Sequence, residues 1–348
     1  MIDYSESVVN HLSVHIVGNK IKEEKLILSP GTIDIQADNL QKLLLTYFLS
    51  NFNTPEYYRF TFSKDGILSN LILKLATNIF LNAKSFHKNS IGIAKHLYEV
   101  TQHPNIKSGD LYVAYLSNIL VDNDLVDAIG IFKSEVKEPY LKLHTSSTEF
   151  RLKRDLGLNI HKLDKGCLIL NVEAEAGFKI LAVDNVSKSD AQFWIKDFLN
   201  VKPCSDGFHH TKNFINLTRQ FVDEQLDEEF SVSKPDKIEL LNRSMNFFKT
   251  RDQFNQQEFE EEVLADASVI ESFRNYERTL LSNRDDHVAD NFEISAHALK
   301  KQPRVFKSVL KLDKNFHIYI HGNRQLIEKG FDEAANKHYY KIYFDQES

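Results

Sequence analysis

The stretch LYVAYLSNILVDNDLVDAIGIFKSE, residues 111–135, decides the fold because it holds two strand-like segments joined by a polar turn. Residues 111–121 and 125–135 carry the β-branched and aromatic side chains that favour strands. The short polar connection between them is typical of a tight reversal of the chain. We therefore expect an antiparallel hairpin at the centre of the first part of the protein.

Helical and strand patterns alternate around this hairpin. Apolar side chains recur every three or four positions, as in helices packed on a core, in residues 40–52, 71–83 and 89–103. Further strands are predicted at residues 57–62, 166–172 and 178–186. An amphipathic helix begins at Asp190 and is closed by Pro203 and Gly207. The first two hundred residues therefore indicate a mixed α/β region.

The pattern becomes helical and acidic after Phe208. Residues 219–296 contain nineteen Asp and Glu against nine Lys and Arg, whereas residues 300–314 contain six basic residues and one acid. Alternating segments then predict strands to the end of the chain, in a small antiparallel meander. We predict an α+β fold with three regions: a mixed α/β domain at 1–205, an acidic helical segment at 206–283, and an antiparallel β region with a basic stretch at 284–348.

The composition restricts the class of protein. Hydrophobic residues are 42% and charged residues 26% of the chain, which is ordinary for a soluble globular protein. The two cysteines, Cys167 and Cys204, form neither a disulfide framework nor a four-ligand zinc pattern. No apolar run reaches the roughly 18 residues needed to cross a bilayer. We expect a cytoplasmic protein without a membrane segment, and its net charge of −6 restricts DNA contact to a local basic patch.

Histidine pairs are the first candidates for a metal site. Cys204 precedes His209 and His210, but Pro203 and Gly207 nearby favour an ordinary turn that joins two parts of the protein. His317 and His321, like His11 and His15, are four residues apart. In a strand that spacing covers about 13 Å, which is too far for both side chains to bind one zinc ion. If the stretch with His11 and His15 were instead a helix, that pair would share a face and the objection would not apply. We predict no metal site.

Acidic motifs give two weaker candidates. Residues 121–127, VDNDLVD, depart from a calcium loop because Asp127 occupies the position that needs glycine. Asp127 with Glu135 and Lys137 matches a short nuclease pattern, but Glu135 and Lys137 more simply lie on the outer face at a strand end. Residues 258–264, EFEEEVL, indicate a solvated helix face or, alternatively, a partner-binding one. No phosphate loop or nucleophile motif occurs, so we predict no catalytic residue and no cofactor.

Basic and aromatic residues gather in the last fifty residues. The predicted strands there sort apolar side chains to one face and Lys, His and Tyr to the other, as on surfaces that track a nucleic-acid backbone. The alternative is the solvated face of a one-sided sheet. The candidate DNA-binding residues are Lys300, Lys301, Arg304, Lys307, Lys311, Tyr319, Arg324 and Lys341.

Four collinear segments carry a resemblance to a known family. They are residues 111–135, residues 158–171 (LNIHKLDKGCLILN), residues 190–217 (DAQFWIKDFLNVKPCSDGFHHTKNFINL) and residues 304–331 (RVFKSVLKLDKNFHIYIHGNRQLIEKGF). With them the chain resembles the bacterial nucleoid-associated protein family typified by YejK, also called NdpA. The resemblance implies a cytoplasmic protein located on the nucleoid, and it supplies no catalytic residue.

The resemblance and the charge pattern together lead to a functional prediction. We expect a non-catalytic nucleoid-associated protein that takes part in chromosome organisation and contacts DNA, or a DNA-bound complex of nucleoid proteins, through the basic patch. The alternative is an adaptor whose acidic helical segment binds a nucleoid enzyme without touching DNA. A metal-dependent nuclease is a third and less favoured alternative.

Overall fold

The computed structural model describes residues 2–36, 39–61, 70–122, 124–145, 149–186, 193–230, 232–282, 289–300, 309–313, 316–319 and 326–346. The chain divides into two compact units, Met1–Cys204 and Ser205–Ser348. Helices and antiparallel sheets are both present, which confirms the predicted α+β class. No helix in the described part of the chain has the length and apolar content needed to cross a bilayer.

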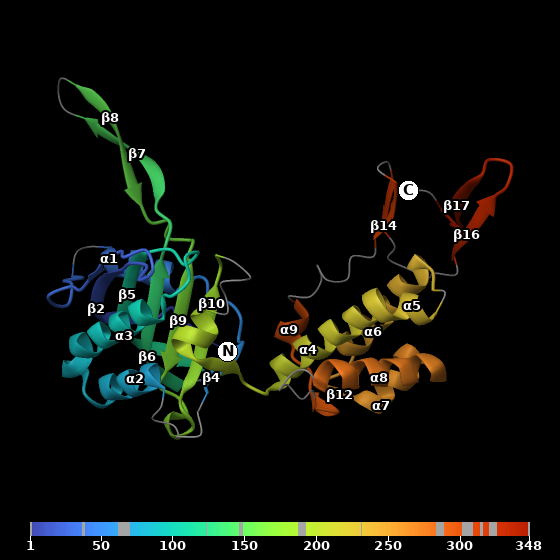
Figure 1. Cartoon of the computed structure of the whole chain (residues 1–348), viewed down its shortest axis with the longest axis horizontal. Helices are drawn as coiled ribbons and strands as arrows, with labels where there is room; N and C mark the ends of the chain where they lie inside the picture. Colours follow the sequence, from blue (N-terminus) through green and yellow to red (C-terminus); the bar gives the residue numbers. More distant parts are fainter. Residues whose placement is uncertain are drawn as a thin grey trace. The chain divides into compact units, whose positions relative to one another are not determined.

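A nine-stranded antiparallel sheet forms the centre of the first unit (Figure 1). Its order is β11-β4-β10-β9-β6-β5-β2-β3, and β1 pairs with β5. The strands are β1 (Ile2–Asp3), β2 (Val8–Val17), β3 (Leu26–Ile27), β4 (Tyr57–Phe60), β5 (Gly109–Val121), β6 (Asp124–Ser134), β9 (Lys165–Leu170), β10 (Lys179–Asp184) and β11 (Val201–Pro203). The predicted hairpin is confirmed as β5–β6, two central strands that pair from Val121–Asp124 onward.

Helices cover both faces of this sheet. On one face lie α2 (Leu71–Leu81), α3 (Phe86–Val100) and the helical turn Phe193–Leu199, which share a core with strand side chains such as Ile131. On the other face lies α1 (Leu40–Leu49), where the ring of Phe48 stacks on that of Phe132 at 4.2 Å. Successive residues of β6 thus point into opposite cores. Because both faces are covered, β9 is buried along its whole length.

A two-stranded hairpin leaves the sheet between β6 and β9 in sequence. Its strands are β7 (Glu138–Thr145) and β8 (Phe150–Gly157), which pair only with each other among the described strands. Figure 1 shows this hairpin, called the arm below, projecting away from the body of the first unit. Its side chains are exposed over nearly the whole length. The arm is not among the strands predicted from the sequence.

The second unit has a helical core rich in phenylalanine, as the helical pattern predicts. Ser233 and Asp236 form a reciprocal cap at the start of one helix, and Asp206 caps another by accepting the backbone N–H of His209. A short sheet of β12 (Gln253–Asn255) and β13 (Asn291–Glu293) completes the core. The helices are α4 (Gly207–Gln220), α5 (Leu226–Glu229), α6 (Lys234–Lys249), α7 (Gln256–Phe259), α8 (Ala267–Ser282) and α9 (Ala296–Lys300).

The last described strands form two separate hairpins. One pairs β14 (Val309–Leu312) with β15 (Phe316–Tyr319), and the other pairs β16 (Ile327–Asp332) with β17 (Lys337–Ile342). The predicted antiparallel pairing is confirmed, and among the described residues it is divided between these two hairpins. The strand β16 is not predicted from the sequence, because IEKGFD contains three charged residues and a glycine, a composition that strands disfavour.

Candidate nucleic-acid interface

The structure describes only part of the predicted C-terminal patch. Lys300 ends α9, Tyr319 lies in β15 with 65% of its surface exposed, and Lys341 is an exposed residue of β17. The backbone of Lys311 lies in β14 opposite His317, while its side chain lies outside the described part. The candidates that fall outside the described residues are Lys301, Arg304, Lys307 and Arg324.

The described candidates are spread over different elements. Lys311 and Tyr319 share the β14–β15 hairpin, whereas Lys341 belongs to the separate β16–β17 hairpin. Lys341 lies directly opposite Glu328, a carboxylate that also accepts a hydrogen bond from the Tyr343 hydroxyl at 2.8 Å. The positive charge of Lys341 is therefore partly balanced within its own hairpin.

The candidate nuclease residues do not come together. Asp127 lies near the start of β6 and accepts a hydrogen bond from the Tyr115 hydroxyl at 2.7 Å. Glu135 follows the end of the same strand, so the two carboxylates are separated by eight residues, or about 26 Å of extended chain. Lys137 is bound instead to Asp110 at 2.8 Å. The outer-face interpretation of Glu135 is wrong, because its side chain is only 3% exposed and its carboxylate pairs with Lys133.

The residues around Cys204 are held by local contacts within each unit. His209 and His210 are both buried at the start of α4. The Nε2 atom of His209 lies 2.9 Å from the amide of Asn213, and that of His210 lies 3.0 Å from the hydroxyl of Ser205. Across the described residues, no cluster of three or more metal-binding side chains occurs. The hydrogen bonds give these histidines a structural role at the start of the second unit.

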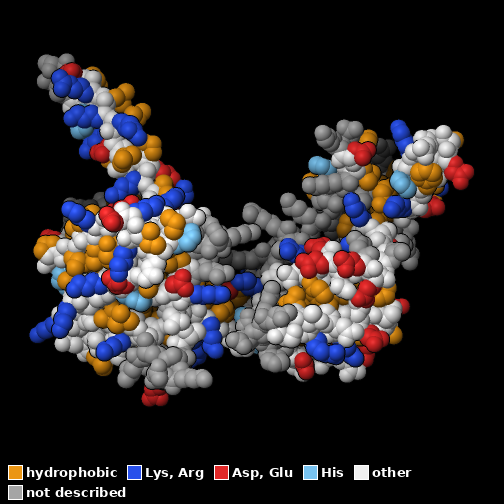
Figure 2. Space-filling model, viewed as in Figure 1, with side chains coloured by type: hydrophobic (Ala, Val, Ile, Leu, Met, Phe, Trp, Pro, Cys, Tyr) orange, Lys and Arg blue, Asp and Glu red, His pale blue; other side chains and the backbone are white. Residues whose placement is uncertain are grey.

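The arm concentrates cations on one of its two faces. Cross-strand partners in an antiparallel ribbon share a face, and successive residues alternate between faces. Lys142 lies opposite Lys153, and His144 lies opposite Arg151, so these four exposed side chains form one surface, called the basic face below. Tyr140 adds an exposed ring to the same face. Figure 2 shows Lys and Arg side chains along one side of the arm and hydrophobic side chains along the other.

The charges of the basic face are largely unbalanced toward the tip of the arm. Lys142 and Lys153 face each other without an ion pair to any described residue, although like charges in such pairs are unfavourable. Arg151 pairs with Glu149 at 2.6 Å, but both side chains are at least half exposed and the pair is therefore weak. The acids near the root, Glu138 and Asp155, are engaged with neighbouring side chains.

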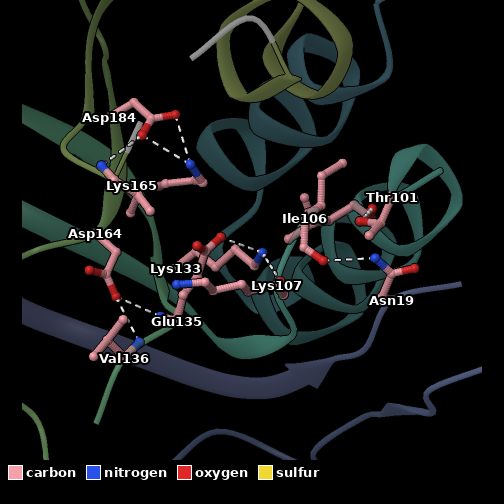
Figure 3. A network of polar contacts seen from close by, with 12 residues as sticks. Asn19, Thr101, Ile106, Lys107, Lys133, Glu135, Val136, Asp164, Lys165 and Asp184 are labelled. Carbon is pink, nitrogen blue, oxygen red and sulfur yellow. Dashed lines mark hydrogen bonds and ion pairs between the residues drawn. The ribbon is translucent and has the colours of Figure 1, made fainter. Parts of the chain in front are cut away.

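A buried ionic network holds the root of the arm (Figure 3). The ammonium of Lys133 donates to Glu135 at 2.7 Å and to the carbonyl of Lys107 at 2.6 Å. The ammonium of Lys165 binds both carboxylate oxygens of Asp184 at 2.8–2.9 Å. Asp164 accepts the backbone N–H of Glu135 at 2.6 Å and that of Val136 at 3.0 Å, where the chain enters the arm. Burial lowers the pKa of Lys133, and Glu135 opposes this shift.

The sequence does carry a signal for the arm. Residues 141–144, LKLH, and residues 150–153, FRLK, alternate apolar and polar side chains around a short Ser and Thr connection. This pattern of period two, followed by a turn, indicates a hairpin.

The arrangement defines an α+β protein with an exposed two-faced β-arm on its first unit and an acidic helical second unit. A scan against protein families matches residues 13–337 to the family described as "Nucleoid-associated protein YejK". The match covers most of the chain, so the protein belongs to this family and the predicted resemblance is confirmed. A search of curated proteins finds no match.

Proposed function

We propose that the protein associates with the nucleoid by binding duplex DNA through the basic face of the arm, and that it acts by binding rather than by catalysis. The observation that carries the proposal is the set of cations on one exposed ribbon face, Lys142, Arg151 and Lys153 with His144. The family match supports the nucleoid role. Because the chain has a net negative charge, it needs a local basic surface of this kind to bind a polyanion such as DNA.

The geometry of the arm is suited to the DNA backbone. A two-stranded ribbon fits the major groove, which is about 12 Å wide, and cations at its rim reach phosphate oxygens on either side. We expect these Lys and Arg side chains to contact phosphate oxygens, and such contacts position a duplex without specifying its sequence. Neutralising three phosphates gives a slope of about −3 for log K against log salt concentration.

Charge reversal tests this proposal. The triple variant Lys142→Glu, Arg151→Glu and Lys153→Glu should have a lower affinity for duplex DNA at low salt. The loss should be similar for duplexes of unrelated sequence. The matched control is Lys74→Glu, Lys84→Glu and Lys95→Glu, which makes the same charge change on exposed lysines of the same unit. Equal loss in both variants would show only a net-charge effect, and no loss in the arm variant would reject the basic face.

The same experiment also tests the C-terminal patch as a second DNA-binding surface. A variant with Lys300, Lys301, Arg304, Lys307 and Lys311 changed to Glu tests the candidates from the sequence. If only this variant loses affinity, the contact belongs to the C-terminal region and not to the arm. Incubating supercoiled plasmid with the protein and Mg²⁺ or Mn²⁺ tests the absence of catalysis, because nicked or linear product would contradict it.

An adaptor function is the second candidate, favoured by a polar cavity in the acidic unit. The cavity has a volume of about 560 Å³ and is lined by Gln256, Glu260, Glu261, Arg274 and Asp290 among others. Its amides and carboxylates suit a cationic side chain of a protein partner. Failure to shift DNA at low salt, together with binding to a purified nucleoid enzyme that Glu261→Lys abolishes, would favour the adaptor over direct DNA binding.

A further inference from the structure

The face of the arm opposite the basic face is mostly apolar, with Arg154 as its one charged member and Thr145 as its one neutral polar member. Its cross-strand pairs are Pro139 with Leu156, Leu141 with Arg154, Leu143 with Leu152, and Thr145 with Phe150. The large apolar members are 52–75% exposed. A two-stranded hairpin is marginal in water unless such a face is covered. This set of side chains, called the apolar ladder below, therefore indicates a surface that is covered in the working protein.

We infer that the apolar ladder packs face to face against the apolar ladder of a second copy of this chain. The two paired ladders match in length, in width and in chemistry, because a twofold arrangement applies the same surface to itself. The one charged member, Arg154, lies near the middle of β8, and its long side chain can turn the guanidinium to solvent at the edge of the two-stranded ribbon. Pairing thus buries leucine and phenylalanine without burying a cation.

Charge also selects the second copy over other occupants. An acidic partner, whether DNA or an acidic protein, is attracted to Lys142, Arg151 and Lys153 on the basic face and gains nothing from leucine side chains. Stacked ribbons lie about 10 Å apart, so two copies that pair through their ladders direct both basic faces outward, away from each other. The paired arms then form a four-stranded unit with cations on both outer surfaces.

The small area of the ladder makes the pairing depend on how close together two copies are held. Each strand of the arm has eight residues. A ribbon of that length is about 27 Å long and 10 Å wide, so a pair buries on the order of 500–1,000 Å², below the roughly 1,200 Å² of a standard stable interface. Pairing is therefore weak between free copies and increases when two copies are held close together, because tethering raises the effective concentration.

The consequence for DNA rests on the proposed function. If each basic face binds a duplex, two paired arms carry two outward DNA surfaces and bridge two duplexes or two segments of one duplex. The ladder then converts single-duplex binding into bridging. A protein whose arms did not pair would coat DNA without connecting it.

Cysteine crosslinking tests the pairing without reference to DNA binding. In a Cys204→Ser background, where Cys167 is buried, Leu143→Cys places a thiol on the ladder and Lys142→Cys places one on the basic face one residue away. A short bis-maleimide should give at least about tenfold more dimer with Leu143→Cys at high protein concentration, with a further rise on long duplex DNA. Equal or negligible dimer from the two thiols would overturn the pairing.

A bridging assay separates the pairing from the proposed function. Wild-type protein should capture a labelled duplex on beads that carry a second duplex, and Leu143→Ser with Leu152→Ser should reduce capture at least about tenfold while affinity for one duplex is retained. Full capture by the serine variant would overturn the inference. Crosslinking through Leu143→Cys without any duplex binding would instead reject the DNA proposal and retain the pairing. Insertion of the ladder into anionic vesicles, with no thiol-linked dimer, would assign the ladder to a lipid surface and overturn the inference.

Discussion

Lys133 on β6 and Lys165 on β9 are direct cross-strand partners, and both residues are only 1% exposed. Two buried ammonium groups on one face of a sheet repel each other and lack water, so each needs its own carboxylate. Glu135 supplies it for Lys133 and Asp184 supplies it for Lys165. The pair lies where the chain leaves β6 for the arm and where it returns to β9. This network therefore ties the arm to the most buried part of the sheet.

Removing one carboxylate of this network should destabilise the first unit strongly. In Asp184→Asn the ammonium of Lys165 stays buried without a counter-charge, which should lower the free energy of unfolding by about 3–5 kcal/mol. The double change Lys165→Met with Asp184→Leu removes both charges and should cost much less. Urea unfolding at pH 7 measures both variants, and a single variant as stable as the wild type would contradict the buried-charge explanation.

Asp164 should control the order of the arm root. Asp164→Ala removes the acceptor for the backbone N–H groups of Glu135 and Val136, a loss worth about 1–3 kcal/mol locally. Hydrogen exchange of these two amides and of the arm should quicken, while exchange in the middle of β5 stays slow. Asp164→Asn keeps an oxygen acceptor and should show a smaller effect. Unchanged protection in the alanine variant would mean that other contacts hold the root.

The sequence predicts the body of the first unit better than its arm. Residues 111–135 indicate the β5–β6 hairpin because β-branched side chains and a polar turn act locally, and the structure confirms it. The sequence predicts Glu135 as a surface residue at a strand end, since the burial of its ion pair with Lys133 depends on Asp164 and Lys165, some thirty residues away. Local patterns give strands and turns, whereas the pairing that buries a charge is a property of the assembled sheet.

In the C-terminal patch, too, the sequence predicts local features better than the assembly of strands. Alternation in the sequence places Lys311, His317 and Tyr319 on one face of a hairpin, and the β14–β15 register agrees. Lys341 belongs to a different hairpin, because β16 intervenes and pairs with β17. Periodicity assigns side chains to faces within a strand, but it does not state which strands share a sheet.

His15 should make the first unit less stable in acid. Its Nδ1 accepts the backbone N–H of Ser29 at 3.1 Å and its Nε2 lies 3.1 Å from the Ser90 hydroxyl, so the neutral ring is the bonded form. Burial, with a contribution from His87, lowers the pKa of His15 to about 4. Between pH 6.5 and 4 the unfolded chain therefore binds more protons, and stability falls as the pH is lowered, by up to about 3 kcal/mol.

His15→Asn tests this effect because the amide oxygen can still accept the Ser29 N–H without titrating. His96 and His210 also have pKa values lowered by burial, so some acid sensitivity should remain in the variant. The informative quantity is the difference between wild type and variant in unfolding free energy at pH 7 and at pH 4.5. Identical pH dependence in the two proteins would exclude His15 as a contributor.

Phe254→Ala should unfold the second unit selectively. The Phe254 ring is 1% exposed and lies 4.3 Å from Phe214 and 4.5 Å from Phe292 between ring centroids, so its removal leaves a large cavity. Such a change costs about 3–5 kcal/mol, and Phe254→Leu should cost less because it refills part of the space.

The single tryptophan of the chain reports on the other unit. Trp194 is fully buried in the first unit, where its indole N–H donates to the carbonyl of Gly166 at 3.1 Å. In Phe254→Ala, the urea transition followed by far-ultraviolet circular dichroism should therefore move to lower urea, while the transition followed by Trp194 fluorescence should stay in place. If both probes shift together, the two units unfold in one cooperative transition. The units Met1–Cys204 and Ser205–Ser348 would then not be independently stable, although each has its own core.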